Sequence, residues 1–420
     1  MAENIHPAKK IVSTGLALSA LLFAAIAPWG HVGAYFAGFV GLLFLPFTSF
    51  SFNNSSCPQK LLMIFLGIFL ICGLILSLFV AYNAKFALTT VFTYFAHWAI
   101  FFLIGLKAKP EHRKTILMIW LFSMLLVALM SLIALLGWID VYRLSNEGLL
   151  KGFQSHIRFG TLLLIAFHFV FALFLNPKNI LKQTIGLGLF ATILLVMIVL
   201  TGSRGVWFAA AISIFGATLH AIFTNRKRKL AIALVVIAVA LGVIVSLSAN
   251  IIHERIRRTG TDDPSYVFRK NNATMALWII EDRPLTGIGP GQVPYAKSYF
   301  DRMADENLEL ESGYLKKRHL HSMYLHVGAE LGLPGLMLLI GVLICFIWMA
   351  IIGAKSQEAF PKTMSYGFLW ATVAVAIGEM LDCLLRGPSV AMELFFFAGI
   401  IAGIAAENSD SHIGERNQSN

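Results

Sequence analysis

Long apolar stretches separated by short polar connections recur along almost the whole chain. A helix needs roughly 20 consecutive apolar residues to cross a bilayer core of about 30 Å. Twelve stretches of about this length occur, and none of them contains lysine or arginine. The predicted spans are residues 11–29, 32–50, 61–82, 86–106, 115–139, 159–175, 183–202, 205–224, 230–249, 323–352, 363–384 and 389–406. The pattern therefore predicts an all-α integral membrane protein.

One connection is far longer than the others. It covers residues 250–322, between the ninth and tenth predicted spans, and long connections of this kind usually carry function. Asp263-Pro264-Ser265 has the character of a helix start, and Arg283-Pro284 would stop that helix before a turn rich in glycine at residues 287–291. The loop is therefore expected to be helical.

These features divide the chain into four parts. Residues 1–249 hold the first nine helices, 250–322 form the loop, 323–406 hold the last three helices, and 407–420 form a polar tail that we expect to be disordered.

Composition agrees with a membrane protein. Hydrophobic residues make up 58% of the chain and charged residues only 13%, whereas soluble domains are about 45 to 50% apolar. The four cysteines do not lie at metal-ligand spacing, so neither structural zinc nor a disulfide is expected.

The distribution of positive charge predicts the orientation, because lysine and arginine concentrate in short cytoplasmic loops. With a cytoplasmic N-terminus, sixteen of the 33 lysine and arginine residues lie on the cytoplasmic side, six lie in short loops on the opposite side and eleven lie in the long loop. Both termini are therefore expected inside and the long loop outside. The formal charge of +11 is mainly an orientation signal, and nucleic-acid binding is a poor second interpretation.

Candidate chemistry begins with the run His321 to Gly335, where the long loop meets the tenth span. His319 and His321 precede the span, and a lone interfacial histidine is more often an anchor than a catalyst. Gly332 and Gly335 would permit a helix kink, and Glu330 is a carboxylate near the membrane that needs a partner. Ordinary helix packing explains the glycines but not His321.

Several arginines are predicted on the same external side. Arg204 lies in the short connection after the seventh span, and Arg269 lies on the predicted loop helix. Each has an ordinary alternative role, as a snorkelling anchor or a solvated helix charge. Arg158 begins the sixth span, and Arg386 follows Asp382 with a spacing at which the two side chains could simply neutralise each other. An external set of guanidinium groups beside a histidine suits binding of phosphate oxygens and proton abstraction.

The run His321 to Gly335 resembles the signature of the O-antigen ligase and polymerase superfamily of membrane glycosyltransferases, and the predicted spans and long loop extend that resemblance over most of the chain. Arg204 resembles the family arginine after the seventh span, and Arg269 with residues 284–289 resembles the family loop segment. The family often has leucine four residues after the arginine, where this chain has Phe208; Arg158 has Leu162 at that spacing, which leaves this motif ambiguous.

The resemblance implies a GT-C-like fold of about twelve transmembrane helices in the bacterial inner membrane, with a helical periplasmic loop between helices nine and ten. It implies transfer of O-antigen polysaccharide from undecaprenyl diphosphate to the lipid A-core oligosaccharide in lipopolysaccharide biosynthesis, with inversion and with no cofactor or metal. His321 would be the base, and Asp382 or Glu330 would orient it. Arg204 and Arg269 would bind the diphosphate, and the weaker candidates for substrate binding are His319, Arg158, Asp382, Arg386 and Glu330.

Three alternatives remain at this point. An O-antigen polymerase or a protein O-oligosaccharyltransferase shares the external loop, arginines and histidine. A transporter with twelve spans fits the length, but no paired half-sequence repeat is found. A structural membrane scaffold needs no external arginine cluster.

Overall fold

The computed structural model describes residues 7–48, 56–138, 145–146, 149–224, 264–308 and 319–418, and these form a bundle of helices with one short hairpin. The helices of the first half are α1 (Pro7–Ile26), η1 (Ala27–Trp29), α2 (His31–Phe44), η2 (Leu45–Phe47), α3 (Cys57–Phe79), α4 (Ala84–Leu106), α5 (Pro110–Leu135), α6 (His156–Phe174), α7 (Leu181–Leu200) and α8 (Arg204–Phe223). Those of the second half are α10 (Pro264–Asp282), η3 (Val293–Tyr295), α11 (Lys297–Asp305), α12 (Met323–Gly353), α13 (Ala359–Gly378) and α14 (Pro388–Gln418). The hairpin pairs β1 (Ser145–Asn146) antiparallel with β2 (Leu149–Leu150).

Nine helices of the described residues are long and apolar enough to cross a membrane. They are Ile11–Trp29, Cys57–Phe79, Ala84–Leu106, Pro110–Leu135, His156–Phe174, Leu181–Leu200, Arg204–Phe223, Met323–Gly353 and Pro388–Ser409. Each overlaps one of the twelve predicted spans. The molecule is therefore a helical protein of the multi-pass membrane class.

The three other predicted spans have different outcomes. Residues 230–249 lie outside the described residues. The second predicted span is a shorter apolar helix, His31–Phe47, which η2 completes after α2. The eleventh is α13, which starts before residue 363 but ends at Gly378, so its predicted last six residues form a turn instead.

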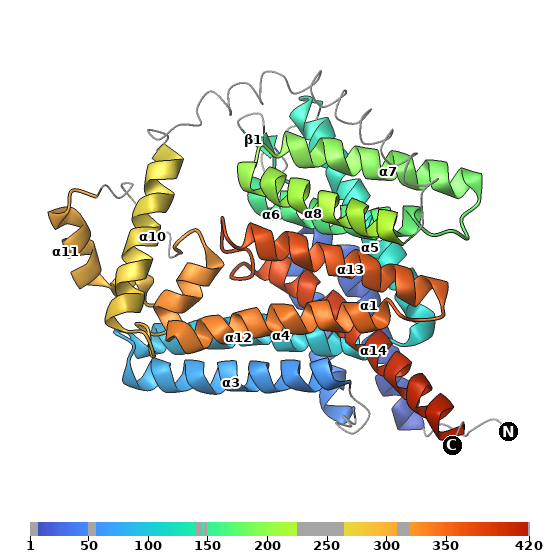
Figure 1. The fold of residues 1–420 in the computed structure, drawn as a ribbon, viewed down its shortest axis with the longest axis horizontal. Coiled ribbons are helices and arrows are strands. Elements are labelled where there is room, and N and C mark those ends of the chain that lie inside the picture. Colours follow the sequence, from blue (N-terminus) through green and yellow to red (C-terminus); the bar gives the residue numbers. More distant parts are fainter. Residues whose placement is uncertain are drawn as a thin grey trace.

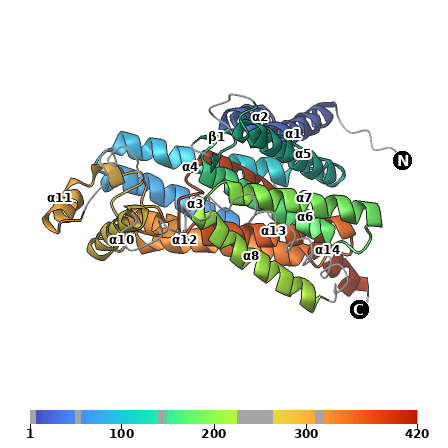
Figure 2. The ribbon, with the colours of Figure 1, turned by 90° about the horizontal axis from the view of Figure 1, so that it is seen from above.

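The helices α14 and α6 form the centre of the bundle. The apolar window of α14 is 94% buried and that of α6 is 83% buried, whereas no other candidate span exceeds 50%. The backbones of α4 and α14 pack closely, because a Cβ atom on Gly105 or Gly399 would overlap a carbonyl group of the opposite helix. The second central helix, α6, packs against α13 and α7. The helix α8 packs against α13 (Figures 1 and 2).

The helix α12 is broken at Gly332, which has a φ of 69° and a ψ of −174°. The break frees backbone groups that bond with the segment after α10. Ile288 N–H donates to the Ala329 carbonyl over 3.0 Å, Gly289 N–H to the Glu330 carbonyl over 2.8 Å, and Leu333 N–H to the Pro284 carbonyl over 2.7 Å. The predicted kink is therefore a docking point for the long loop.

The described part of the long loop has a small core of its own. The predicted helix start is confirmed at Pro264, and α10 ends at Asp282, directly before Arg283-Pro284. Buried side chains of α10 and α11 pack together and against Ala329 of α12. The guanidinium of Arg302 on α11 lies over the ring of Trp278, 4.0 Å from its centroid. Both helices lie at the end of the bundle opposite the C-terminal end of α14 (Figure 1).

The prediction of a disordered tail from residue 407 was wrong for most of the tail, because α14 continues to Gln418. Glu407 receives two hydrogen bonds from the guanidinium of Arg113, at 2.7 and 2.8 Å. This bidentate pair joins α14 to α5 beyond the apolar part of α14. The start of the polar tail is therefore held by a charged partner on another helix, which hydropathy does not reveal.

Candidate functional site

Connections that are distant in the sequence meet at the end of the bundle where α10 lies. Residues 319–322 lead into α12, and the turn after Gly378 lies against them, because Met323 N–H donates to the carbonyls of Glu379, at 2.8 Å, and Asp382, at 3.2 Å. The start of α8 adjoins the same turn, since a Cβ atom on Gly205 would lie 3.4 Å from the Leu381 side chain. The α3–α4 turn joins this end through Gln292, whose Oε1 accepts from Asn83 N–H at 2.7 Å.

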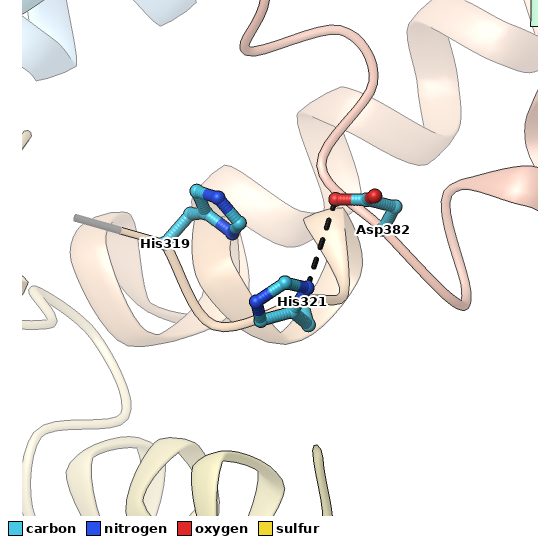
Figure 3. A group of neighbouring side chains, drawn as sticks. All are labelled: His319, His321 and Asp382. Carbon is cyan, nitrogen blue, oxygen red and sulfur yellow. Dashed lines mark ion pairs between the residues drawn. The ribbon is translucent and has the colours of Figure 1, made fainter. Parts of the chain in front are cut away.

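His321 is held away from the helical path that begins two residues later. Its φ is 53°, in the left-handed region, which residues with a side chain seldom adopt. Its Nδ1 lies 3.9 Å from Asp382 Oδ1, and both side chains are partly buried, with 19% and 17% exposed. Its ring stands edge-on to that of Phe268, with centroids 5.4 Å apart. Figure 3 shows the imidazole directed toward the carboxylate.

His319 lies beside His321 on the same segment (Figure 3), and the two ring centroids are 4.4 Å apart. Burial lowers the pKa of His319 to about 4, and the neighbouring His321 and the guanidinium groups of Arg386 and Arg158 act in the same direction. The carboxylate of Asp382 opposes them. His319 is therefore neutral at neutral pH.

The turn between α13 and α14 carries both Asp382 and Arg386. Asp382 Oδ1 accepts from the N–H of Cys383 at 2.7 Å, which fixes the carboxylate within its own turn. Arg386 does not form the simple pair with Asp382 that its spacing allowed, because its Nε donates to the Tyr94 hydroxyl of α4 at 2.6 Å. One guanidinium is thereby fixed between α4 and the turn.

Arg158, in the first turn of α6, lies against the same turn. A Cβ atom on Gly387 would lie 2.6 Å from its Nε, so the absence of a side chain there makes room for the guanidinium. Asp382 and Arg386 are among its charged neighbours. The structure thus brings His319, His321, Asp382, Arg158 and Arg386 into one cluster, which we call the imidazole–guanidinium cluster.

Arg269 and the start of α8 border this cluster. A cleft beside the turn after α13 is lined by Arg269 of α10, Asp382, and Ser203 and Gly205 on either side of Arg204, together with apolar side chains of α6, α8 and α13. Arg204 is the first residue of α8, where Ser203 caps the helix and Gly202 has a φ of 64°. Arg269 of α10 and the start of α8 on both sides of Arg204 therefore border the turn that carries Asp382.

Glu330 belongs to a different pair. Its Oε1 lies 3.2 Å from His326 Nε2, one turn earlier on α12, and the two side chains are 3% and 0% exposed. Of the two carboxylates proposed to orient His321, only Asp382 therefore lies beside it.

The side chains of His319, His321 and Asp382 could also hold a cation, since one ligand atom from each lies within 4.8 Å of the others. Arg158 and Arg386 add positive charge around these donors, which disfavours a cation and favours an anion. The absence of a metal from the chemistry thus stays a prediction.

Three further residues contribute to the site and were not predicted from the sequence. Phe268 packs on His321, Tyr94 receives the hydrogen bond of Arg386, and the Glu379 carboxylate accepts hydrogen bonds within the turn that carries Asp382. Only Phe268 had a sequence signal, since it precedes Arg269 on the loop helix. Tyr94 and Glu379 lie in or next to apolar stretches and match no motif.

The fold and the cluster together define a multi-pass helical membrane protein with a partly buried histidine, carboxylate and guanidinium site at one end. Residues 188–340 match the family model described as O-antigen ligase, and this match supports assignment of the chain to the O-antigen ligase family. The matched segment includes Arg204, Arg269, His319 and His321, whereas Arg158, Asp382 and Arg386 lie outside it. None of the curated proteins matches the chain.

Proposed function

We propose that the protein is an O-antigen ligase, a glycosyltransferase that moves O-antigen polysaccharide from undecaprenyl diphosphate to the lipid A-core oligosaccharide. The observation that carries the proposal is the position of His321, which lies 3.9 Å from Asp382 in a cluster with two arginines, in a chain whose residues 188–340 match the O-antigen ligase family. The proposed location is the bacterial inner membrane, with both termini in the cytoplasm and the cluster facing the periplasm.

In the proposed reaction, His321 removes the proton from a hydroxyl group of the acceptor sugar. The resulting oxygen attacks the anomeric carbon of the lipid-linked glycan, the bond from that carbon to the diphosphate oxygen breaks, and undecaprenyl diphosphate leaves with the bonding electrons. Attack from the face opposite the diphosphate inverts the anomeric carbon. The imidazolium that forms on His321 is stabilised by the negative charge of Asp382.

The arginines would act on the leaving group. Arg269 lines the cleft together with Asp382 and with the two residues that flank Arg204, and Arg158 and Arg386 add positive charge near Asp382. A hydrogen bond to a charged group is worth about 1.5 to 3 kcal/mol, so two or three such bonds would stabilise the departing diphosphate substantially. This set of charges supports an anionic lipid-linked donor.

The test is transfer by the purified protein in lipid nanodiscs, with lipid-linked O-antigen as donor and lipid A-core as acceptor. We expect His321→Ala to abolish product formation while the variant remains in the membrane fraction at the level of the wild type. Unchanged transfer by that variant would exclude the proposed base.

The lipopolysaccharide of a deletion strain distinguishes the related activities. Loss of all O-antigen with accumulation of lipid-linked polymer supports a ligase. Core capped by a single repeat unit indicates a polymerase instead, and an unchanged profile would direct attention to another glycan acceptor or to transport.

A further inference from the structure

A buried carboxylate lies immediately after α13, where the proposed reaction assigns no function. Glu379 is fully buried, with 0% of its surface exposed. An ionisable side chain in such a place must be paired or hydrogen-bonded to offset the loss of its hydration. The hydrogen-bond partners of Glu379 therefore indicate which part of the structure its side chain stabilises.

Both carboxylate oxygens of Glu379 accept hydrogen bonds from the turn that follows. Leu384 N–H donates to Oε2 at 3.0 Å, and Leu385 N–H donates to Oε1 at 2.8 Å. The side chain thus closes the segment from residue 379 to residue 385 on itself. Asp382 lies inside this closed segment and Arg386 directly follows it.

The backbone of the same turn also holds the segment that carries His321. Met323 N–H donates to the carbonyls of Glu379 and Asp382, at 2.8 and 3.2 Å. Met323 is the first residue of α12 and lies two residues after His321. One turn therefore fixes both His321 and Asp382, and the Glu379 carboxylate fixes the turn.

We propose that Glu379 is a positioning residue, which holds the turn of Asp382 and Arg386 in register with His321 so that the carboxylate of Asp382 faces the imidazole. This inference rests on the proposed glycan transfer. Glu379 touches neither substrate nor reacting atoms, and it acts through Asp382.

The main variant is Glu379→Gln, which keeps the length of the side chain but replaces one acceptor oxygen with an amide NH₂ that cannot accept a hydrogen bond. We expect kcat for transfer to fall at least about tenfold, with KM for the lipid-linked donor changed by less than about threefold, because proton transfer and not donor binding is misaligned. Glu379→Asp keeps the carboxyl group with a shorter reach and should lie between the wild type and Glu379→Gln.

A double-mutant cycle separates positioning from general support of the fold. If Glu379 acts through Asp382, then Glu379→Gln should lower kcat by less than about threefold further once Asp382→Asn is present. Losses that simply multiply would overturn the proposal. If Glu379→Gln does not accumulate in the membrane, the same cycle with Glu379→Asp decides the question.

Glu393→Gln is the matched control. Glu393 is also a buried carboxylate, on α14, and it accepts from Trp120 Nε1 of α5 at 2.9 Å, a hydrogen bond that involves no residue of the turn. The kcat of the Glu393→Gln variant should stay within about twofold of the wild type, because the turn that carries Asp382 is unaltered. A wild type without any transfer would instead contradict the proposed function, whereas an active wild type with an equally active Glu379→Gln variant would contradict only the positioning proposal.

Discussion

At the scale of single residues, the backbone of His321 is the most unusual feature of the site. A residue with a side chain in the left-handed region typically costs about 1 to 3 kcal/mol, and such strain persists only where the surroundings fix it. Here Phe268, His319 and Asp382 surround the ring, and Met323 is bonded to the turn that carries Asp382. The strained residue turns the imidazole toward the carboxylate before α12 begins.

The charge of Asp382 can be tested without disturbing its turn. In Asp382→Asn the amide oxygen can still accept the hydrogen bond from Cys383 N–H, so only the negative charge beside His321 is removed. We expect kcat for glycan transfer to fall about 10- to 100-fold. This loss is smaller than the roughly 10²- to 10⁴-fold rate enhancement that a general base contributes, because His321 itself is still present. Asp301→Asn on the exposed face of α11 is the control. A rate within twofold of wild type in Asp382→Asn would show that the carboxylate has no part in the reaction.

The lowered pKa of His319 predicts a specific dependence of stability on pH. Well above pH 6.5 the residue is neutral in both folded and unfolded chains and contributes no pH dependence. Between pH 6.5 and about 4 the unfolded chain binds the proton more readily, so stability falls as the pH falls. The thermal midpoint of the solubilised protein should therefore drop less from pH 7 to pH 5 in His319→Gln than in the wild type. Equal drops would mean that His319 is not held neutral by the fold.

The same cluster predicts the response to metal removal. His319, His321 and Asp382 have the spacing of a cation site, but Arg158 and Arg386 oppose positive charge there. We expect a chelator to leave the initial rate of transfer unchanged. A loss of activity with chelator that Zn²⁺ or Mg²⁺ restores would show that the three side chains hold a functional cation.

At the scale of elements, the break in α12 determines where the loop helices dock. Gly332 has a φ of 69°, and a Cβ atom there would lie 2.6 Å from the carbonyl carbon of Leu285. Gly332→Ala should thus lower stability by more than the roughly 1 to 3 kcal/mol of backbone strain alone and should reduce transfer, since α10 carries Arg269. Thermal unfolding and the rate of transfer measure the two effects.

The control for that substitution is Gly67→Ala in α3, where a new Cβ atom would meet nothing within 4 Å. Alanine is favoured over glycine within a helix, so this variant should be as stable as the wild type or slightly more stable. If both variants behave alike, the conformation at Gly332 is not what holds the loop in place.

Element boundaries also show where prediction from sequence succeeds and where it fails. Uninterrupted apolar runs identified the nine candidate spans because burial in lipid or protein requires them. The predicted eleventh span extended too far because Cys383 and Leu384 are buried in a turn, and hydropathy does not distinguish a buried turn from a helix. The turn is possible because the Glu379 carboxylate accepts hydrogen bonds from the backbone N–H groups of Leu384 and Leu385, and hydropathy does not encode this pairing of a side chain with the backbone.

At the scale of the whole molecule, the cluster is assembled from segments more than 200 residues apart in the chain, such as Arg158 and Arg386. The sequence predicted a common side of the membrane for these residues, because the charge distribution orders the loops. It could not choose between Asp382 and Glu330 as the neighbour of His321, since that choice depends on how the turn after α13 packs against the start of α12. Tertiary packing places Asp382, and not Glu330, beside His321.

The predicted orientation of the bundle has a direct test with thiol labelling. Cys57 is exposed at the start of α3, whereas the other end of α3 leads to the turn that bonds with Gln292. In a variant with the other three cysteines replaced by serine, a membrane-impermeable maleimide added to spheroplasts should not label Cys57. The same reagent should label a cysteine introduced by Ala304→Cys, on the exposed face of α11, when Cys57 is also replaced. Labelling of Cys57 without labelling at position 304 would invert the assigned topology and place the cluster on the cytoplasmic side, where a periplasmic ligase could not use it.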